Sequence, residues 1–387
     1  MNLPIMGVMG SNPRKNKEKI MKKILVAASM MLFGMMSVQA ANNYTPAGTA
    51  IENNATLTYS AGGVDQPEVN ATISAGQTSA DVFVVDNKID LIVTHQDPTA
   101  VAVVPGAQDQ VLTFVVRNDG NKVQDYKLTS TANDGNPYAG INDTFDTDNV
   151  RIFVDKNNNG VYDPGTDDQT YIDELAPDAN VTVFIVSNIP IAQQNGDAAE
   201  YSLTAQVAEG GTAATQGADI TNDDRNNADD AMTEQIVFAD GDGNGATEGD
   251  KDGQFADHSA YQIQAPQLIL EKESCVLSDP INITTNPKRI PGATIRYMFD
   301  IENDGSVDAT NVTLKDLLND ALDIATLANV ITNEHQDDGQ CVCATNAANG
   351  AAPGHSENGQ EVTLTGVNVS SAAHERHTCV SFEVEIK

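Results

Sequence analysis

Hydrophobic and polar residues alternate in short runs along most of the chain. Runs such as "QVLTFVVRNDG" at 110–120, "NVTVFIVSNI" at 180–189 and "EYSLTAQVAEGG" at 200–211 are rich in β-branched and aromatic residues. Gly, Pro, Asn or Asp bounds most of these runs, and a period of two places alternate side chains on opposite faces of a strand. Short strands at regular spacing predict an all-β protein of antiparallel β-sandwiches.

One stretch has a helical period instead. In "LKDLLNDALDIATLANVI", residues 314–331, Leu, Ala and Ile recur at the spacing of an amphipathic helix. We therefore expect one short helix in the C-terminal domain. An irregular loop is the competing interpretation.

The hairpin pattern occurs twice. "VPGAQDQVLTFVVRNDGNKVQDYKLT" starts at Val104 and "IPGATIRYMFDIENDGSVDATNVTLKD" starts at Ile290. Both contain Pro-Gly, an alternating strand, Asn-Asp-Gly and a second strand. Pro-Gly turns the chain before the strand, and Asp-Gly supplies the positive φ of a tight β-hairpin turn. Two copies predict two related domains.

The second copy resembles a known family. Pro291–Gly292, Tyr297, Asn303–Gly305 and "ATNVTLKD" at 309–316 match the conserved repeat domain of unknown function, number eleven in its series, of large exported bacterial proteins. The resemblance covers residues 266–387. It implies immunoglobulin-like (Ig-like) sandwiches in a surface or envelope protein without known catalysis, and it supplies no site residues.

The N-terminal 40 residues have the pattern of a secretory signal peptide. Lys22 and Lys23 precede the apolar run "ILVAASMMLFGMM", and "VQA" stands before Ala41 as a cleavage site. We expect translation to start at Met21, and whether residues 1–20 are translated stays open. A membrane anchor is the competing interpretation, but a spanning helix needs about 20 apolar residues. The expected domains are a signal peptide (1–40), a strand-rich lead-in (41–88), a sandwich with acidic loops (89–265) and the repeat-type domain (266–387).

The exported part is strongly acidic. Residues 1–40 contain six of the 21 lysines and arginines and one of the 55 acidic residues, so residues 41–387 carry 15 basic and 54 acidic side chains, a formal net charge of −39. Such a chain repels nucleic acid and anionic membranes. We expect it in the periplasm, at the cell surface or outside the cell, without membrane insertion after signal cleavage. The partner, a surface or envelope protein or a glycan, and the oligomeric state are not determined by the sequence.

The stretch "DKNNNGVYDPGTDD", residues 155–168, begins like a calcium-binding loop. Asp and Asn alternate, and a Gly follows at the sixth position, where the loop must turn sharply. Thr166 stands at the twelfth position in place of the usual Glu, so Asp167 or Asp168 must close the shell. An Asx-rich turn that binds no ion is the competing interpretation. The candidate ligands are Asp155, Asn157, Asn159, the carbonyl of Val161, Asp163, Asp167 and Asp168.

A second acidic loop, "DGDGNGATEGDKDG" at 240–253, has a related pattern. Lys251 occupies its twelfth position, so Asp250 or Asp252 must complete the shell. A solvated acidic loop is the competing interpretation. The candidate ligands are Asp240, Asp242, Asn244, Glu248, Asp250 and Asp252. Structural Ca²⁺ is the only cofactor that we expect.

All four cysteines lie in the C-terminal domain. An even number in an exported protein predicts two disulfides. The two sets left open are Cys275–Cys341 with Cys343–Cys379, and Cys275–Cys343 with Cys341–Cys379. The alternative is a zinc site. Its ligands would be Cys341, Cys343, His374, His377 and Cys379. His95, His258, His335 and His355 have the pattern of isolated surface residues.

The sequence lacks the common catalytic motifs, including Gly-x-Ser-x-Gly, His-Glu-x-x-His and the phosphate-binding loops. We therefore expect a non-catalytic exported structural or cell-surface protein. An adhesin or a carbohydrate- or protein-binding module is the first alternative, and an unrecognised hydrolase is the second. Asn54, Asn70 and Asn180 match an acid-x-Asn-x-Thr glycosylation acceptor, and whether they are modified stays open.

Overall fold

The computed structural model describes residues 44–53, 55–70, 81–132, 138–245, 249–336, 341–343 and 352–387. The predicted signal peptide, Asn54 and Glu248 therefore lie outside the described residues. The chain divides into two compact units, 1–46 and 47–387. In the described part of the chain, no helix is long and apolar enough to cross a membrane.

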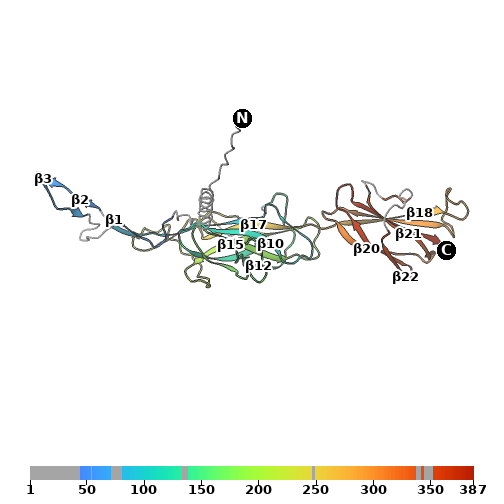
Figure 1. Ribbon diagram of the computed structural model, residues 1–387, viewed down its shortest axis with the longest axis horizontal. Coiled ribbons are helices and arrows are strands. Elements are labelled where there is room, and N and C mark those ends of the chain that lie inside the picture. Colours follow the sequence, from blue (N-terminus) through green and yellow to red (C-terminus); the bar gives the residue numbers. More distant parts are fainter. Residues whose placement is uncertain are drawn as a thin grey trace, which may run out of the picture. The chain divides into compact units, whose positions relative to one another are not determined.

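Strands and loops make up the described chain (Figure 1). The lead-in contains β1 (Ala50–Asn53), β2 (Thr56–Leu57), β3 (Ser60–Ala61), β4 (Val64–Asp65), β5 (Val69–Asn70), β6 (Asp81–Val84) and β7 (Asn87–Ile89). The first sandwich contains β8 (Leu91–His95), β9 (Val101–Val103), β10 (Gln110–Asn118), β11 (Gln124–Ala132), β12 (Asp148–Val154), β13 (Tyr171–Leu175), β14 (Asn180–Asn188), β15 (Ala198–Glu209) and β17 (Gln254–Ile263), and β16 (Ile236–Phe238) lies between its last two strands in sequence. The second sandwich contains β18 (Leu268–Ser278), β19 (Thr294–Asn303), β20 (Ala309–Leu317), β21 (Leu322–Gln336), β22 (Gly354–Asn358), β23 (Glu361–Val369) and β24 (His377–Ile386).

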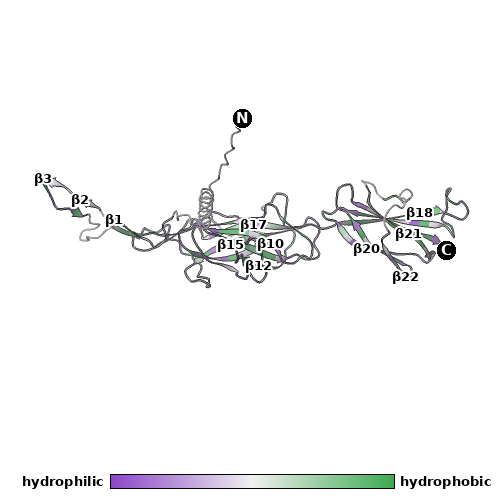
Figure 2. Cartoon of the chain, in the orientation of Figure 1, coloured by the Kyte–Doolittle hydropathy of each residue, from purple (hydrophilic) through white to green (hydrophobic). Residues whose placement is uncertain are grey.

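The first sandwich packs the sheet β12-β14-β10-β8 against the sheet β13-β11-β15-β17-β9. Leu112, Phe114 and Val116 alternate along β10, and all three are buried in the same core as Tyr201 and Leu203 of β15. Hydrophobic residues accordingly lie along the strands, and hydrophilic residues lie along many connecting loops (Figure 2). The predicted alternation of hydrophobic and polar residues thus indicates which side chains of a strand enter the core.

The second sandwich packs the sheet β18-β19-β24-β21 against the sheet β20-β23-β22. Phe299 of β19 and Phe382 of β24 lie with ring centroids 5.8 Å apart, and Val362 and Leu364 of β23 complete the core from the other sheet. The predicted all-β class of tandem sandwiches is therefore confirmed, and the pairs are antiparallel apart from β9, which runs parallel to β17 at the edge of the first sandwich. The domain boundaries at 88 and 265 stay predictions.

The lead-in strands pair mainly with each other. β1 pairs antiparallel with β6, β2 with β5 and β3 with β4. β7 instead runs parallel to β16. Ile89, the last residue of β7, is buried in the first core, so this end of the lead-in is anchored by packing as well as by hydrogen bonds.

The predicted helix at 314–331 is wrong. These residues form the end of β20, a turn and the start of β21. Leu314, Leu318 and Leu322 are buried in one core at a spacing of four residues, because β20 and β21 belong to the two facing sheets and the turn between them crosses the edge of the core. The turn is fixed by Asn319, whose carbonyl accepts the N–H of Leu322 at 2.9 Å and whose side chain accepts the N–H of Ala321 at 3.0 Å.

The predicted hairpins at the two Asn-Asp-Gly segments are also wrong. β10 ends at Asn118, but the next strand, β11, belongs to the opposite sheet. β19 ends at Asn303, and β20 likewise belongs to the opposite sheet. Both segments therefore carry the chain from one sheet to the other. The predicted Pro-Gly turns are confirmed, since Gly106 and Gly292 have φ values of 81° and 80°.

The glycines of these crossings are required by close approach and not by a positive φ. Neither Gly120 nor Gly305 has a left-handed φ. A Cβ on Gly120 would lie 2.4 Å from the carbonyl oxygen of Lys88, and a Cβ on Gly305 would lie 2.2 Å from that of Ala265. Each crossing thus packs against the backbone of the segment that enters its own sandwich, which leaves no room for a side chain.

The asparagine of each crossing closes the same turn. Asn118 accepts the N–H of Gly120 at 3.0 Å, and Asn303 accepts the N–H of Gly305 at 3.0 Å. Both side chains are buried and donate to two backbone carbonyl groups. The sequence repeat therefore corresponds to a repeated polar cap within each sandwich.

Candidate metal centres

The loop 155–168 joins β12 to β13 and begins directly after a core strand. Its ends are tied together, because the N–H of Val154 donates to the carbonyl of Gln169 at 2.8 Å. Asp155 and Asp167 are buried, at 3% and 1% exposure. Two carboxylates of one loop are therefore withdrawn from water, and each needs nearby hydrogen-bond donors or a cation to offset the lost hydration.

The side chains at the third, fifth and ninth positions meet. Asp163 accepts the side-chain N–H groups of Asn157 at 2.8 Å and of Asn159 at 2.7 Å through the same oxygen, Oδ2. These two bonds lower the pKa of Asp163. Gly160 has a φ of 77°, as its place at the sharp turn predicts. The loop thus gathers three of its predicted ligands around one point.

The two buried carboxylates organise the loop backbone. Asp155 accepts the N–H of Asn159 at 3.2 Å and of Gly160 at 2.7 Å. Asp167 accepts the N–H of Lys156 at 3.0 Å and of Asp163 at 2.7 Å. Of the two candidate closing residues, Asp167 therefore faces the loop.

The other candidate closing residue faces solvent. Asp168 pairs with the Lys156 ammonium group at 2.9 Å, and this contact lowers the pKa of Asp168. Val161 has an exposed side chain, and its N–H donates to Asn159 at 2.8 Å. The predicted calcium ligation stays a prediction, since the hydrogen bonds described so far also suit an Asx-rich turn.

The second acidic loop is organised around Asp240. This carboxylate is fully buried and accepts the N–H groups of Asp252 at 3.0 Å and of Gly253 at 3.2 Å. Burial raises the pKa of Asp240, although the hydrogen bonds oppose it. Asp250 instead pairs with the neighbouring Lys251 at the surface. Asp240 and Asp252 are thus brought together, and Asp250 is not.

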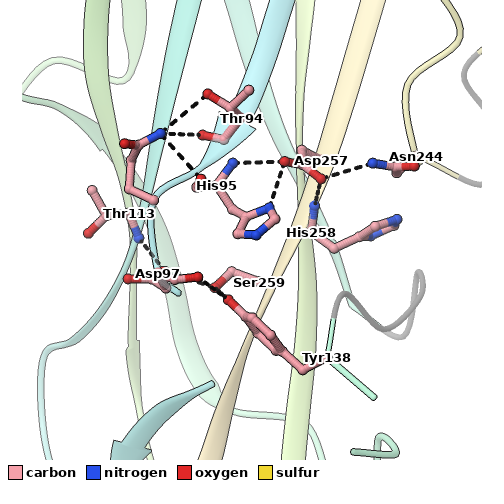
Figure 3. Close-up of polar contacts among 10 residues, drawn as sticks. Thr94, His95, Asp97, Thr113, Tyr138, Asn244, Asp257, His258 and Ser259 are labelled. Atoms are coloured by element: carbon pink, nitrogen blue, oxygen red, sulfur yellow. Dashed lines mark hydrogen bonds and ion pairs between the residues drawn. The ribbon is translucent and has the colours of Figure 1, made fainter. Parts of the chain in front are cut away.

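Asn244 of this loop belongs to a different polar cluster (Figure 3). Its side chain donates to Asp257 Oδ1 at 3.0 Å, while His95 Nδ1 lies 2.7 Å from Asp257 Oδ2. Burial alone would raise the pKa of Asp257, but hydrogen bonds from the backbone and the ring of His95 lower it. The expectation of isolated surface histidines is wrong for His95, which is paired here, and for His258, which is buried.

The same cluster contains a serine hydroxyl, which bears on the hydrolase alternative. Ser259 donates to Asp97 Oδ2 at 2.8 Å, and the Tyr138 hydroxyl donates to the carbonyl of Asp97 at 2.7 Å (Figure 3). A serine nucleophile requires a base within hydrogen-bond reach of its hydroxyl. The Ser259 hydroxyl donates its hydrogen bond to a carboxylate and not to His95, so this geometry supports a structural role for the cluster.

One acidic cluster that the sequence did not reveal could hold a metal ion. Asp125, Asp173 and Glu174 each place a carboxylate oxygen within 4.8 Å of the others. Each also accepts backbone N–H groups: Asp125 accepts those of Glu174 and Gly217, at 2.8 and 2.9 Å. The side chains of Asp173 and Glu174 accept from Ala214 and Gly211. These bonds clamp the chain after β15 and account for the three acids without an ion.

The cluster is produced by a β-bulge. Gln124 pairs with Leu175 and Tyr126 pairs with Ile172, so one residue of β11 stands opposite two residues of β13. Asp125 therefore faces the adjacent acids of "YIDEL". The residues lie about 50 positions apart, and no local spacing could have indicated their proximity.

Both predicted disulfides are present. Cys275 is bonded to Cys343, and Cys341 to Cys379. This pairing is one of the two sets that the sequence left open. The alternative zinc site with cysteine ligands is excluded, because all four sulfur atoms are used in disulfides.

Comparison with known proteins gives no family. No family model and no curated protein matches the chain. Solved structures that resemble it include the collagen adhesin from S. aureus, at 10% identity over 78% of this chain and 84% of that chain, with a TM-score of 0.17. They also include the CupB6 tip adhesin from Pseudomonas aeruginosa, at 9% identity over 79% and 90%, with a TM-score of 0.24. Scores this low carry no argument about function, and the predicted family resemblance stays a prediction.

Proposed function

We propose that this chain is a non-catalytic exported structural or cell-surface protein, whose first sandwich is stabilised by calcium in the loop 155–168. The signal-peptide pattern, the two disulfides and the acidic composition support export. The geometry of Ser259, whose hydroxyl is held by Asp97, supports a role without catalysis.

One observation carries the calcium proposal. Asp163 stands where the amide groups of Asn157 and Asn159 converge, and the buried carboxylates of Asp155 and Asp167 belong to the same loop. Calcium takes about six to eight oxygens at 2.3–2.6 Å, many of them from alternate positions of such a loop. When an ion binds, the two amides must turn their oxygens toward it, which exchanges two hydrogen bonds for ion contacts.

Calorimetric titration of the mature chain tests this proposal. After chelation and dialysis, calcium should bind with a measurable heat, and magnesium should bind much more weakly. Asp155→Ala should abolish the heat. Asp168→Ala is the matched control, because Asp168 belongs to the same segment but faces Lys156 at the surface. Absent calcium binding, or binding that survives Asp155→Ala, overturns the proposed site.

Export is tested separately at the N-terminus. Protein purified from its native host should begin at Ala41 if the signal peptide is removed. A first residue at Met1 or Met21 overturns the export proposal and leaves the calcium result unaffected.

A binding module is the second candidate, and the edge strand β18 favours it. β18 lies at the edge of its sheet. Leu268, Ile269 and Leu270 are consecutive and between 42% and 55% exposed. Exposed apolar edges commonly serve as contact surfaces for partners. This candidate gains weight if calcium has no effect, since the acidic surface then requires another cause such as a cationic partner.

A further inference from the structure

A small pocket opens where β24 begins. Its volume is about 170 Å³, and it is lined by Glu302, His374, Arg376 and His377. Glu302 of β19 stands directly opposite His377 of β24 in the sheet. His374 lies in the turn that leads into β24, with a left-handed φ of 75°. Two imidazoles and a carboxylate are thereby brought to one concave place.

The ring of His377 is held in a fixed orientation. Its Nδ1 lies 2.9 Å from Asp300 Oδ1. Asp300 is buried, and its other oxygen accepts the N–H of Cys341 at 3.1 Å. Cys341 is itself fixed by its disulfide to Cys379. A carboxylate that accepts from Nδ1 leaves Nε2 as the ligand atom, which is the usual arrangement behind a metal-bound histidine.

The other ring nitrogen faces a second carboxylate without touching it. His377 Nε2 lies 3.8 Å from Glu302 Oε1, which is too far for a good hydrogen bond. Two ligands on one tetrahedral zinc ion, with bonds of about 2.0–2.1 Å, are about 3.3 Å apart. A small movement of the exposed end of Glu302 would therefore allow both atoms to hold one ion.

The charges around the pocket favour a cation. Arg376 also lines the pocket, but it forms an ion pair with Asp304. Glu302 and Asp300 contribute two further carboxylates next to His377. The ligand atoms of His374, His377 and Glu302 do not all lie within 4.8 Å of one another, as those of the cluster around Asp125 do, so ion binding requires side-chain rotation within the pocket.

We propose that His374, His377 and Glu302 form a site for a divalent transition-metal ion of the zinc type, with Asp300 orienting His377. Imidazole ligands prefer zinc and copper to calcium or magnesium. Two histidines and one carboxylate complete three positions of a tetrahedral shell and leave the fourth for water or a partner's side chain. The site is separate from the calcium loop and does not depend on it.

The competing arrangement is a His377 ring held between two carboxylates without a metal. Zinc titration of the mature chain with intact disulfides distinguishes the two. The site predicts one equivalent of bound zinc, and addition of Co²⁺ in place of zinc should give visible absorption of tetrahedral cobalt. A histidine that only bridges the two carboxylates predicts neither signal.

Variants assign the binding to these residues. His374→Gln, His377→Gln and Glu302→Gln should each weaken zinc binding at least tenfold, and Asp300→Asn should weaken it about 10- to 100-fold through loss of the orienting bond. His355→Gln, on an exposed strand of the same sandwich, is the control and should bind like the wild type. Because Glu302 is partly exposed, its variant should stay folded, which circular dichroism checks. The proposal is overturned if the wild type does not bind zinc. It is also overturned if Glu302→Gln and His374→Gln bind zinc as tightly as the wild type does.

Discussion

Asp155 accepts a hydrogen bond from the backbone N–H of Gly160, with the two atoms 2.7 Å apart. The carboxylate is buried, and the glycine has a left-handed backbone with a φ of 77°. The first residue of the loop therefore fixes its sharpest turn. Asp155 has two roles in this account, since it orders the loop backbone and supplies a calcium ligand.

The first role predicts a loss of stability without any metal. Asp155→Ala removes the carboxylate that accepts the Gly160 N–H and one of the two acceptors of the Asn159 N–H, and hydrogen bonds to a charged group contribute about 1.5–3 kcal/mol. Urea denaturation in the presence of chelator should show this loss. Asp168→Ala should unfold almost like the wild type, and an equal loss in both variants would contradict the assigned role.

The glycines of the two sheet crossings should not tolerate a methyl group. Gly120→Ala and Gly305→Ala would place a Cβ 2.4 and 2.2 Å from a backbone carbonyl oxygen, so the backbone must shift. We expect each to cost about 2 kcal/mol or more, at the upper end of overpacking effects. Gly241→Ala is the control, because its Cβ would meet Phe255 at an ordinary 3.8 Å. Denaturation of the three variants checks the ranking, and no difference among them would refute the close-approach argument.

Asp279 should titrate far below an ordinary aspartate. Its carboxylate accepts the backbone N–H groups of Asn282, Lys288 and Ile281, which lower its pKa from 3.8 to about 2. The charged form is favoured in the folded state, so its contribution is complete above about pH 4 and is lost as the pH falls toward 2. Carbon NMR titration of this carboxyl group should give a midpoint near 2, whereas a midpoint near 3.8 would show that the bonds do not form.

The disulfide pairing predicts which peptides stay linked after proteolysis and how much the free energy of unfolding falls when one disulfide is removed. Cys341 and Cys379 are 38 residues apart, and closing a loop of that size contributes about 4 kcal/mol in the chain-entropy model. The double change of Cys341→Ala with Cys379→Ala should therefore lower the free energy of unfolding by roughly this amount. Thermolysin, which cleaves before Val342, separates Cys341 from Cys343 and allows mass spectrometry to read the pairs. A fragment that joins Cys275 to Cys341 would contradict the observed pairing.

Much of the architecture could be predicted from the sequence because a strand's burial depends on its own alternation. The alternation that places Leu112 and Phe114 on one face is enough to predict which face of β10 enters the core, without information from any other segment. The disulfide cysteines and the calcium-type loop were also visible, since each depends on residue type or local spacing. The pairing of the cysteines was not, because two sets fit the same order along the chain.

The wrong helix and hairpin predictions have one physical cause. The same spacing of residues along a sequence can arise from more than one three-dimensional structure. Leu314, Leu318 and Leu322 form a stripe of period four that a helix and a strand–turn–strand satisfy equally. Asn-Asp-Gly is typical of a hairpin turn. In the folded protein, however, Gly120 is required because the backbone of Lys88 leaves no space for a Cβ atom. The contact of Asp125 with the acids of β13 depends on a bulge in the pairing, and pairing is a property of the folded sheet.

Thermal unfolding of the mature chain tests the calcium account most directly. An ion that binds only the folded state raises the melting temperature by mass action. We expect the midpoint to rise clearly in millimolar calcium relative to chelator, to rise little in magnesium, and to lose most of the calcium response in Asp155→Ala but not in Asp168→Ala. An unchanged midpoint in calcium would contradict the account, and "DKNNNGVYDPGTDD" would then be an Asx-rich turn held by its own carboxylates.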